Sequence, residues 1–186
     1  MATLIPAIGT CLPRMTSGER RLAERLEQKL DDDCIPLFKP ISCGRDGQAP
    51  QIIRRPNPHP EATKVAELLN AAHHESHAWG DMAVICRRYD VMVACAHALN
   101  RARLPHQVRK GAGSFHPNED TIKVLTMHAS KGLEFPVVAL VGVGRMPAAG
   151  EDEREEARLF YVGATRATNM LLISLNGTGS FSKKLA

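Results

Sequence analysis

A short polar segment that could bind an anion lies between two apolar runs near the middle of the chain. The runs cover residues 122–127 and 137–143 and are rich in Val and Ile, as is typical of strands buried on both faces of a parallel sheet. Ligands bind such sheets beyond the carboxyl ends of the strands, where backbone N–H groups and cations face anions. The candidate residues there are His128, Ser130, Lys131, Gly132 and Glu134. A turn with a solvated connection would give the same local pattern.

A second candidate for anion binding is Arg166. It follows an acid-rich helix start, EDEREE, and a continuation, ARLFYVGATRAT, which predicts one helix with negative charge at its favourable N-terminal end. Leu159 and Val162 form the apolar stripe of this helix, and Arg166 falls on the same stripe. An arginine in line with a core face either reaches the edge of the domain or binds an anion.

Three histidines, His73, His74 and His77, lie together near the end of another predicted helix. A metal site is conceivable, but no cysteine or acid has the spacing to complete it. We therefore interpret these residues as a solvated polar face and predict no metal site.

The elements that must position these residues alternate along the chain. Apolar patterns predict a helix from Pro60 to just before Gly80, a helix over 91–101 and strands over 82–86, 104–108 and 170–174. Residues 51–54 could add a short strand, and the segment from Asn176 onward is expected to be a polar tail. This β-α-β alternation predicts an α/β fold with a parallel sheet and right-handed crossovers.

The first part of the chain has a different pattern. Leu22, Leu26 and Leu30 form one stripe of an amphipathic helix within an otherwise irregular arm. Residues 34–60 hold six of the twelve prolines, which is linker composition. We therefore predict an N-terminal helical arm over residues 1–42 and a domain over residues 43–186.

Composition narrows the functional classes. Aromatic residues make up only 4%, so base stacking cannot be the main mode of nucleic-acid binding, while a net charge of +4 permits an anionic partner. The five cysteines include no CxxC pair, as expected for reduced thiols in a cytoplasmic protein, and Cys86 and Cys95 fit small core residues. No apolar run is long enough to span a membrane.

Two of these segments resemble known helicase motifs. The stretch TIKVLTMHASKGLEFPVVALVGV is similar to motif V of the UvrD/Rep family of superfamily 1 DNA helicases, and EEARLFYVGATRAT is similar to motif VI. The stretch DMAVICRR and the helix after it resemble the segment that precedes motif V. The resemblance covers residues 51–174 and implies the second RecA-like domain of a helicase motor, with helices on both faces of a parallel sheet.

The resemblance also implies roles for single residues. Arg166 matches the arginine that reaches the γ-phosphate of ATP bound on the first RecA-like domain. Glu134 matches the acid that contacts the nucleotide sugar, and Gly132 matches a backbone position close to the phosphates. Thr126 and His128 match positions that contact the backbone of single-stranded DNA, which positions the strand without reading its sequence.

The chain departs from the family pattern in its phosphate-binding parts. It contains no GxxxxGK[ST] loop, and no strand ends in an Asp-Glu pair for magnesium. Few residues separate Lys110 from Thr121, so the large domain inserted before motif V in UvrD and Rep is absent, as in compact family members. ATP with magnesium is therefore expected to bind only if a protein partner or another domain supplies the first motor half.

The stretch GTCLPRMTSGERRLAERLEQKLDDD shows a weaker resemblance to the opening helix of the nuclease-related NERD domain. The acidic strands of that nuclease do not follow, which suggests a shortened protein or an arm of unrelated origin. Two hypotheses for the whole chain remain open. It is a helicase motor half that acts on single-stranded DNA, or a non-catalytic module, derived from such a helicase, that binds DNA or a protein.

Overall fold

The described part of the chain belongs to one compact unit, Pro40–Ala186. The computed structural model describes residues 49–109, 115–116 and 118–185. The predicted N-terminal arm over 1–42 and its amphipathic helix lie outside the described residues. The predicted boundary at residue 43 therefore stays a prediction.

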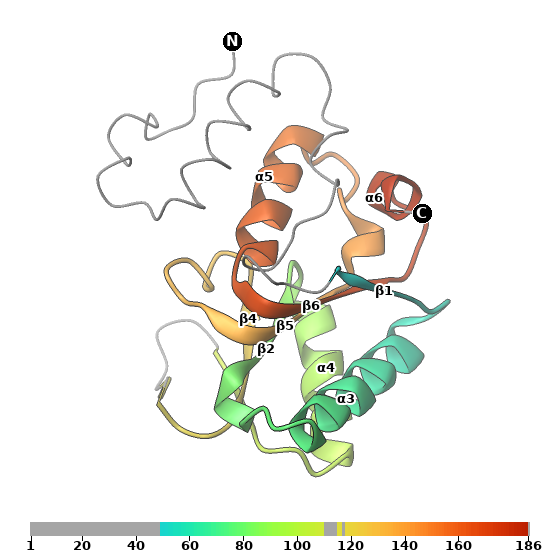
Figure 1. Ribbon diagram of the computed structural model, residues 1–186. Helices are drawn as coiled ribbons and strands as arrows, with labels where there is room; N and C mark the ends of the chain where they lie inside the picture. Colours follow the sequence, from blue (N-terminus) through green and yellow to red (C-terminus); the bar gives the residue numbers. More distant parts are fainter. Residues whose placement is uncertain (1–48, 110–114, 117, 186) are drawn as a thin grey trace, which may run out of the picture. The chain divides into compact units, whose positions relative to one another are not determined.

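Six parallel strands form a single sheet at the centre of this unit (Figure 1). The spatial order is β1-β6-β5-β2-β4-β3, and every neighbouring pair is parallel. The strands are β1 Gln51–Arg54, β2 Met82–Cys86, β3 His106–Val108, β4 Ile122–Thr126, β5 Phe135–Val141 and β6 Ala167–Leu175. The predicted parallel α/β sheet is confirmed, including the short strand at 51–54.

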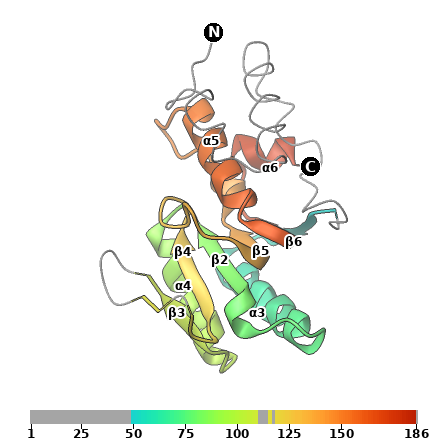
Figure 2. The same cartoon turned by 60° about the vertical axis from the view of Figure 1, so that its left-hand side comes forward.

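Helices cover both faces of the sheet (Figures 1 and 2). The helices α3, Pro58–His74, and α4, Tyr89–Arg101, share a core with alternate side chains of the strands, among them Val84 and Cys86. On the other face lies α5, Glu153–Ala164, which approaches so closely that a Cβ at Gly163 would lie 2.9 Å from the Leu140 side chain. The prediction of helices on both faces is confirmed. Cys86 and Cys95 are buried free thiols, as predicted.

The helix predicted to continue to residue 168 ends earlier, at Ala164. Asp152 caps its start, where the carboxylate accepts hydrogen bonds from the backbone N–H groups of Arg154 and Glu155, both at 2.9 Å. At its end the Thr165 hydroxyl donates to the Tyr161 carbonyl at 3.0 Å. Strand β6 starts at Ala167, so Arg166 lies in the junction between helix and strand.

The prediction of a polar tail from Asn176 onward is wrong. Asn176 is buried, and residues Ser180–Lys184 form a short helix, α6, beside the 3-10 turn η4, Val143–Arg145. Phe181 is 0% exposed and packs edge-on against Phe160 of α5, with ring centroids 6.0 Å apart. Phe181 and Leu185, two apolar side chains in an otherwise polar stretch, are both buried.

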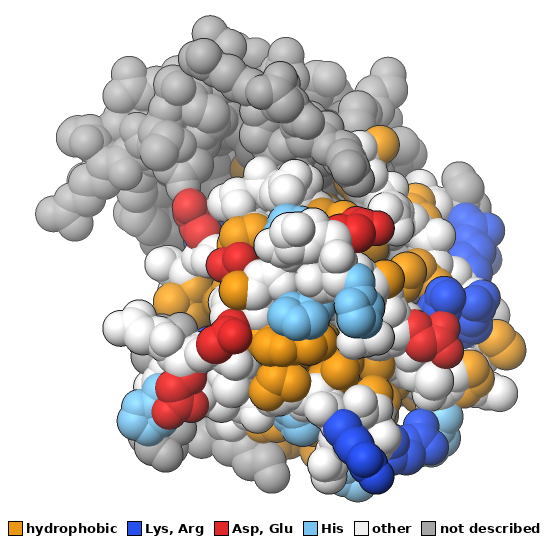
Figure 3. Space-filling view, turned by 60° about the horizontal axis from the view of Figure 1, so that its bottom comes forward, with side chains coloured by type: hydrophobic (Ala, Val, Ile, Leu, Met, Phe, Trp, Pro, Cys, Tyr) orange, Lys and Arg blue, Asp and Glu red, His pale blue; other side chains and the backbone are white. Residues whose placement is uncertain are grey.

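The histidines at the end of α3 are explained by packing. Figure 3 views the molecule from the side on which α3 and α4 lie in Figure 1, and histidine and hydrophobic side chains are neighbours there. The His73 ring stacks on Trp79 at 3.7 Å, and its Nδ1 lies 2.8 Å from the His77 carbonyl oxygen. Within the described residues, no group of three or more His, Cys, Asp or Glu side chains could hold a metal ion. No helix in the same part of the chain is long and apolar enough to cross a membrane.

A buried carboxylate, Glu61, joins α3 to the ends of β5 and β6. Its side chain is 1% exposed and accepts hydrogen bonds from the Ser174 hydroxyl at 2.7 Å, the Gly142 backbone N–H at 3.3 Å and the Asn176 amide. Burial raises the pKa of Glu61, and the Ser174 and Gly142 bonds oppose this rise. The carboxylate thus fixes the first turn of α3 over the carboxyl ends of two strands.

A buried ammonium group, Lys123, lies within the apolar run that forms β4. It is 0% exposed, and its Nζ donates to the carbonyls of His116 and Glu119 and to the Thr121 hydroxyl at 2.8 to 2.9 Å. Lys123 pairs with Ala83 in the ladder and so lies on the face of α5. Lys123 thus ties His116, Glu119 and Thr121 to β4.

We predict that Glu61→Gln lowers the free energy of unfolding by about 1–3 kcal/mol, because the new amide leaves one of the three donors around it unpaired. The folded-state pKa of Glu61 is raised, so its ionisation costs stability as pH rises above the ordinary range of the carboxyl group. The advantage of the native protein over Glu61→Gln should therefore grow from pH 7 to pH 4.5. Urea denaturation of both proteins between pH 4.5 and pH 7 measures this difference in the free energy of unfolding.

Glu67→Gln is the matched control, because Glu67 lies on the same helix with its side chain 58% exposed. It should change the free energy of unfolding by less than about 0.5 kcal/mol. Equal effects of the two substitutions would show that Glu61 does not hold the fold together.

Candidate nucleotide and DNA site

The crossover segment, residues 127–134, runs from the carboxyl end of β4 to the amino end of β5. Hydrogen bonds within the segment set its turns: the Thr126 hydroxyl accepts from the Ala129 N–H at 3.2 Å, and the Ser130 hydroxyl donates to the Met127 carbonyl at 2.8 Å. Ser130 is buried and structural, which removes it from the candidate list. His128 and Lys131 remain exposed.

The candidate residues separate into two groups along this crossover. Thr126 and His128 lie at the carboxyl end of β4, whereas Gly132 and Glu134 lie at the amino end of β5. The sequence analysis placed His128, Gly132 and Glu134 together beyond the carboxyl ends of the strands. That prediction is wrong for Gly132 and Glu134, because the connection from β4 to β5 contains no helix and crosses the sheet in eight residues.

Arg166 lies beside the second group. Its Nη1 donates to the Leu133 carbonyl at 3.1 Å, and its own carbonyl accepts from the Phe135 N–H at 2.8 Å. Its Nε and Nη2 donate to the Val162 carbonyl at 3.0 Å and to the Thr165 hydroxyl at 3.1 Å. These described hydrogen bonds go to uncharged oxygens and none goes to a carboxylate.

Arg166 is therefore bonded to Leu133, the residue between Gly132 and Glu134. The side chain of Arg166 does not point freely into solvent, because the carbonyls of Val162 and Leu133 hold the half-buried guanidinium. Val162 is half-exposed rather than part of a buried stripe.

Gly132 and Glu134 present an open surface. Gly132 has a φ of +79°, in the left-handed region, and a Cβ built there would meet nothing within 4 Å. Glu134 is exposed. A ligand can approach the backbone at Gly132 with a carboxylate on one side and the Arg166 guanidinium nearby.

His128 lies in positively charged surroundings at the other end of the crossover. Desolvation lowers the pKa of His128, and the charges of Arg87 and Lys131 lower it further. The imidazole is neutral near pH 7 and can donate one N–H, while the neighbouring cations favour an anionic ligand.

Arg87 is a site residue that the sequence pattern did not single out. It follows β2 directly, and its Nε donates to both carboxylate oxygens of Glu156 at 2.9 and 3.0 Å, while its Nη2 donates to Glu151 at 2.9 Å. Glu156 is 4% exposed, and burial raises its pKa against the opposing effect of Arg87. The two consecutive arginines after a fully buried strand were the available signal.

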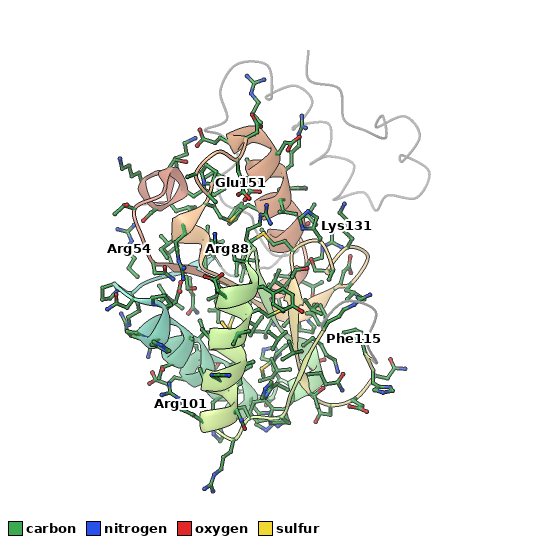
Figure 4. The ribbon with its side chains drawn as sticks, turned by 180° about the vertical axis from the view of Figure 1, so that it is seen from behind. Arg54, Arg88, Arg101, Phe115, Lys131 and Glu151 are labelled. Atoms are coloured by element: carbon green, nitrogen blue, oxygen red, sulfur yellow. The ribbon has the colours of Figure 1, made fainter. Side chains whose placement is uncertain are left out.

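A cavity of about 10 Å³, the size of one water molecule, adjoins this ion pair. Arg88 and Glu151 contribute to its wall, together with Arg145. Figure 4 shows Arg88 and Glu151 close to each other between α4 and α5. The cavity is too small for a nucleotide.

Comparison with known proteins identifies the part of the chain that carries these groups. Residues 110–178 match the family model of the UvrD-like helicase C-terminal domain. This range includes the crossover segment, α5 and Arg166. These residues belong to the UvrD-like helicase C-terminal domain family.

Curated relatives extend the similarity of this UvrD-like domain beyond the matched range. The ATP-dependent DNA helicase Rep of Escherichia coli K12 is 30% identical over 162 residues, which cover 84% of this chain and 22% of that protein. The ATP-dependent DNA helicase PcrA of Leuconostoc citreum is 44% identical over 78 residues, 38% of this chain and 10% of that protein. The chain spans less than a quarter of the length of these relatives.

A solved structure with the same fold is the C-terminal domain of a possible DNA helicase from Lactobacillus plantarum WCFS1. It matches with a TM-score of 0.62 at 22% identity, over 83% of this chain and 90% of that one. This match confirms the RecA-like fold of the UvrD-like domain.

We predict that Arg87→Ala costs more stability than Arg166→Ala. Removing Arg87 leaves the buried Glu156 without its charged partner and should lower the free energy of unfolding by about 3 kcal/mol. Arg166→Ala removes bonds to groups that water can replace and should cost about 1 kcal/mol. Urea denaturation of both variants at pH 7 measures the difference, and a larger loss for Arg166→Ala would contradict the assignment of Arg87 as the more structural arginine.

Proposed function

We propose that this chain is the C-terminal motor domain of a UvrD-like ATP-dependent DNA helicase. It contributes DNA-backbone contacts and one arginine to an ATP site that another domain or chain completes. The observation that carries the proposal is the hydrogen bond between Arg166 and the Leu133 carbonyl, which brings a cation beside Gly132 and Glu134. The curated relatives named Rep and PcrA, both ATP-dependent DNA helicases, support it.

The residues around Arg166 fit one side of a nucleotide. The Glu134 carboxylate can accept hydrogen bonds from sugar hydroxyls, the open backbone at Gly132 allows close approach, and the Arg166 guanidinium can face phosphate oxygens. ATP with magnesium would supply the phosphoryl group and part of the charge neutralisation when bound. The described residues offer no cluster of metal ligands, so the metal and the remaining phosphate contacts belong to the completing half.

Arg166 must leave its present contacts to reach a phosphate. Its three side-chain hydrogen bonds go to uncharged oxygens of Val162, Leu133 and Thr165. Charge-assisted bonds to phosphate are about twice as strong as neutral ones, so an anion in reach favours the turned-out side chain. Arg166 would then stabilise the charge that develops on the transferred group.

Thr126 and His128 are the proposed contacts to single-stranded DNA. Arg87 and Lys131 add positive charge around His128. Contacts of this kind bind phosphates and do not distinguish bases.

A second candidate function is a non-catalytic module that binds DNA or a protein. The engagement of both arginines favours it, because Arg87 is held by Glu151 and Glu156 and Arg166 by backbone carbonyls. Catalysis by the completed motor requires Arg166 to be released, whereas a binding module does not.

We predict no ATP hydrolysis by the purified chain, with or without single-stranded DNA. The chain contains no GxxxxGK[ST] loop to hold the phosphates, and this chemistry depends on positioning and electrostatics. Phosphate release assays measure it. ATP hydrolysis by the native chain that is lost in Arg166→Ala would contradict this prediction, because the chain would then hold a complete ATP site.

We predict weak DNA binding that is indifferent to sequence and falls steeply with salt, by about 0.7 log units per log unit of salt for each phosphate contact. A phosphate beside His128 favours its protonated form, so affinity should rise as pH falls below the ordinary range of histidine, toward the lowered pKa of His128 in the free protein. His128→Gln should abolish this pH dependence. Fluorescence anisotropy with oligonucleotides of two sequences provides the readout, and a tight complex that ignores salt would refute phosphate binding.

A further inference from the structure

We propose that Phe115 and Arg109 form a base-stacking site for single-stranded DNA beside the crossover segment. The proposal rests on the DNA binding proposed above and adds a contact to the base to those with phosphates. It concerns residues between β3 and β4, outside the two helicase motifs.

Arg109 links Phe115 to the crossover segment. Its guanidinium carbon lies 5.1 Å from the centre of the Phe115 ring, within the range of a cation–π contact. Its Nη1 donates to the Ala129 carbonyl at 3.1 Å, and Ala129 in turn donates to the Thr126 hydroxyl. The ring, the guanidinium and a proposed phosphate contact thus form one connected group.

Lys123 fixes the position of the ring. Its buried Nζ lies 5.8 Å from the ring centre and donates to the carbonyl of His116, the next residue along the chain. The His116 N–H donates to the Gln107 side chain at 3.2 Å. Phe115 is therefore held by contacts from β3 and β4 and is not fully buried.

The arrangement suits a strand in which phosphates and bases alternate. Phe115 and Lys131 lie on the same side of the molecule (Figure 4). An aromatic ring and a guanidinium both offer flat faces to a base, and every base has such a face. Phosphates bound near Thr126 and His128 would leave a neighbouring base within reach of this flat surface.

The test compares a fluorescent oligonucleotide with an abasic strand of equal length and equal phosphate number, at one salt concentration. The native chain should bind the base-bearing strand about tenfold more tightly, as expected for one stacked base. Phe115→Ala and Phe115→Leu should both lose this preference and keep the same salt dependence. Leucine keeps an apolar side chain next to Lys123, so a loss of preference in Phe115→Leu reports lost stacking rather than unfolding. Phe115→Trp should retain the preference for the base-bearing strand.

Tyr89→Ala is the matched control, since Tyr89 is a 50% exposed aromatic at the start of α4. It should retain the full preference for the base-bearing strand. Equal binding of both strands by the native chain, or an unchanged preference in Phe115→Leu, would overturn the stacking site and leave phosphate binding intact. Binding of neither strand by the native chain would overturn the DNA proposal itself, and this one with it.

Discussion

The site depends on the link between the starts of β5 and β6 at Arg166. The backbone of Arg166 accepts from Phe135 at 2.8 Å, and its side chain donates to Leu133 at 3.1 Å, so one residue holds the end of the crossover segment twice. This link sets where Gly132 and Glu134 face solvent. The junction after α5 therefore places an arginine, a carboxylate and an open backbone together although they are about 30 residues apart in the chain.

Buried charges hold the loops around this link in place. Glu61 fixes the ends of β5 and β6, Lys123 fixes the segment over β4, and the Arg87–Glu156 pair joins β2 to α5. Each buried charge costs desolvation free energy, which its hydrogen bonds offset only in part. These buried charged side chains fix the positions of loops that contain few apolar side chains of their own.

The sheet and most of its helices could be predicted because strands buried on both faces give continuous apolar runs. The crossover could not be placed from sequence, because local pattern does not show that eight residues would cross the sheet without a helix. The bond from Arg166 to the Val162 carbonyl depends on where α5 stops, which local pattern does not show either. Lys123 inside a strand and Phe181 in a polar stretch contradict their local pattern, since tertiary contacts decide their burial.

The central claim, that Arg166 completes an ATP site formed with another motor half, can be tested by mixing. The chain is combined with a purified first motor domain of a UvrD-like helicase and single-stranded DNA, and phosphate release is measured. Our account predicts that turnover rises on mixing and falls by about 10³-fold with Arg166→Ala, whereas Arg101→Ala at the end of α4 has no effect. Turnover that rises equally with Arg166→Ala would contradict it.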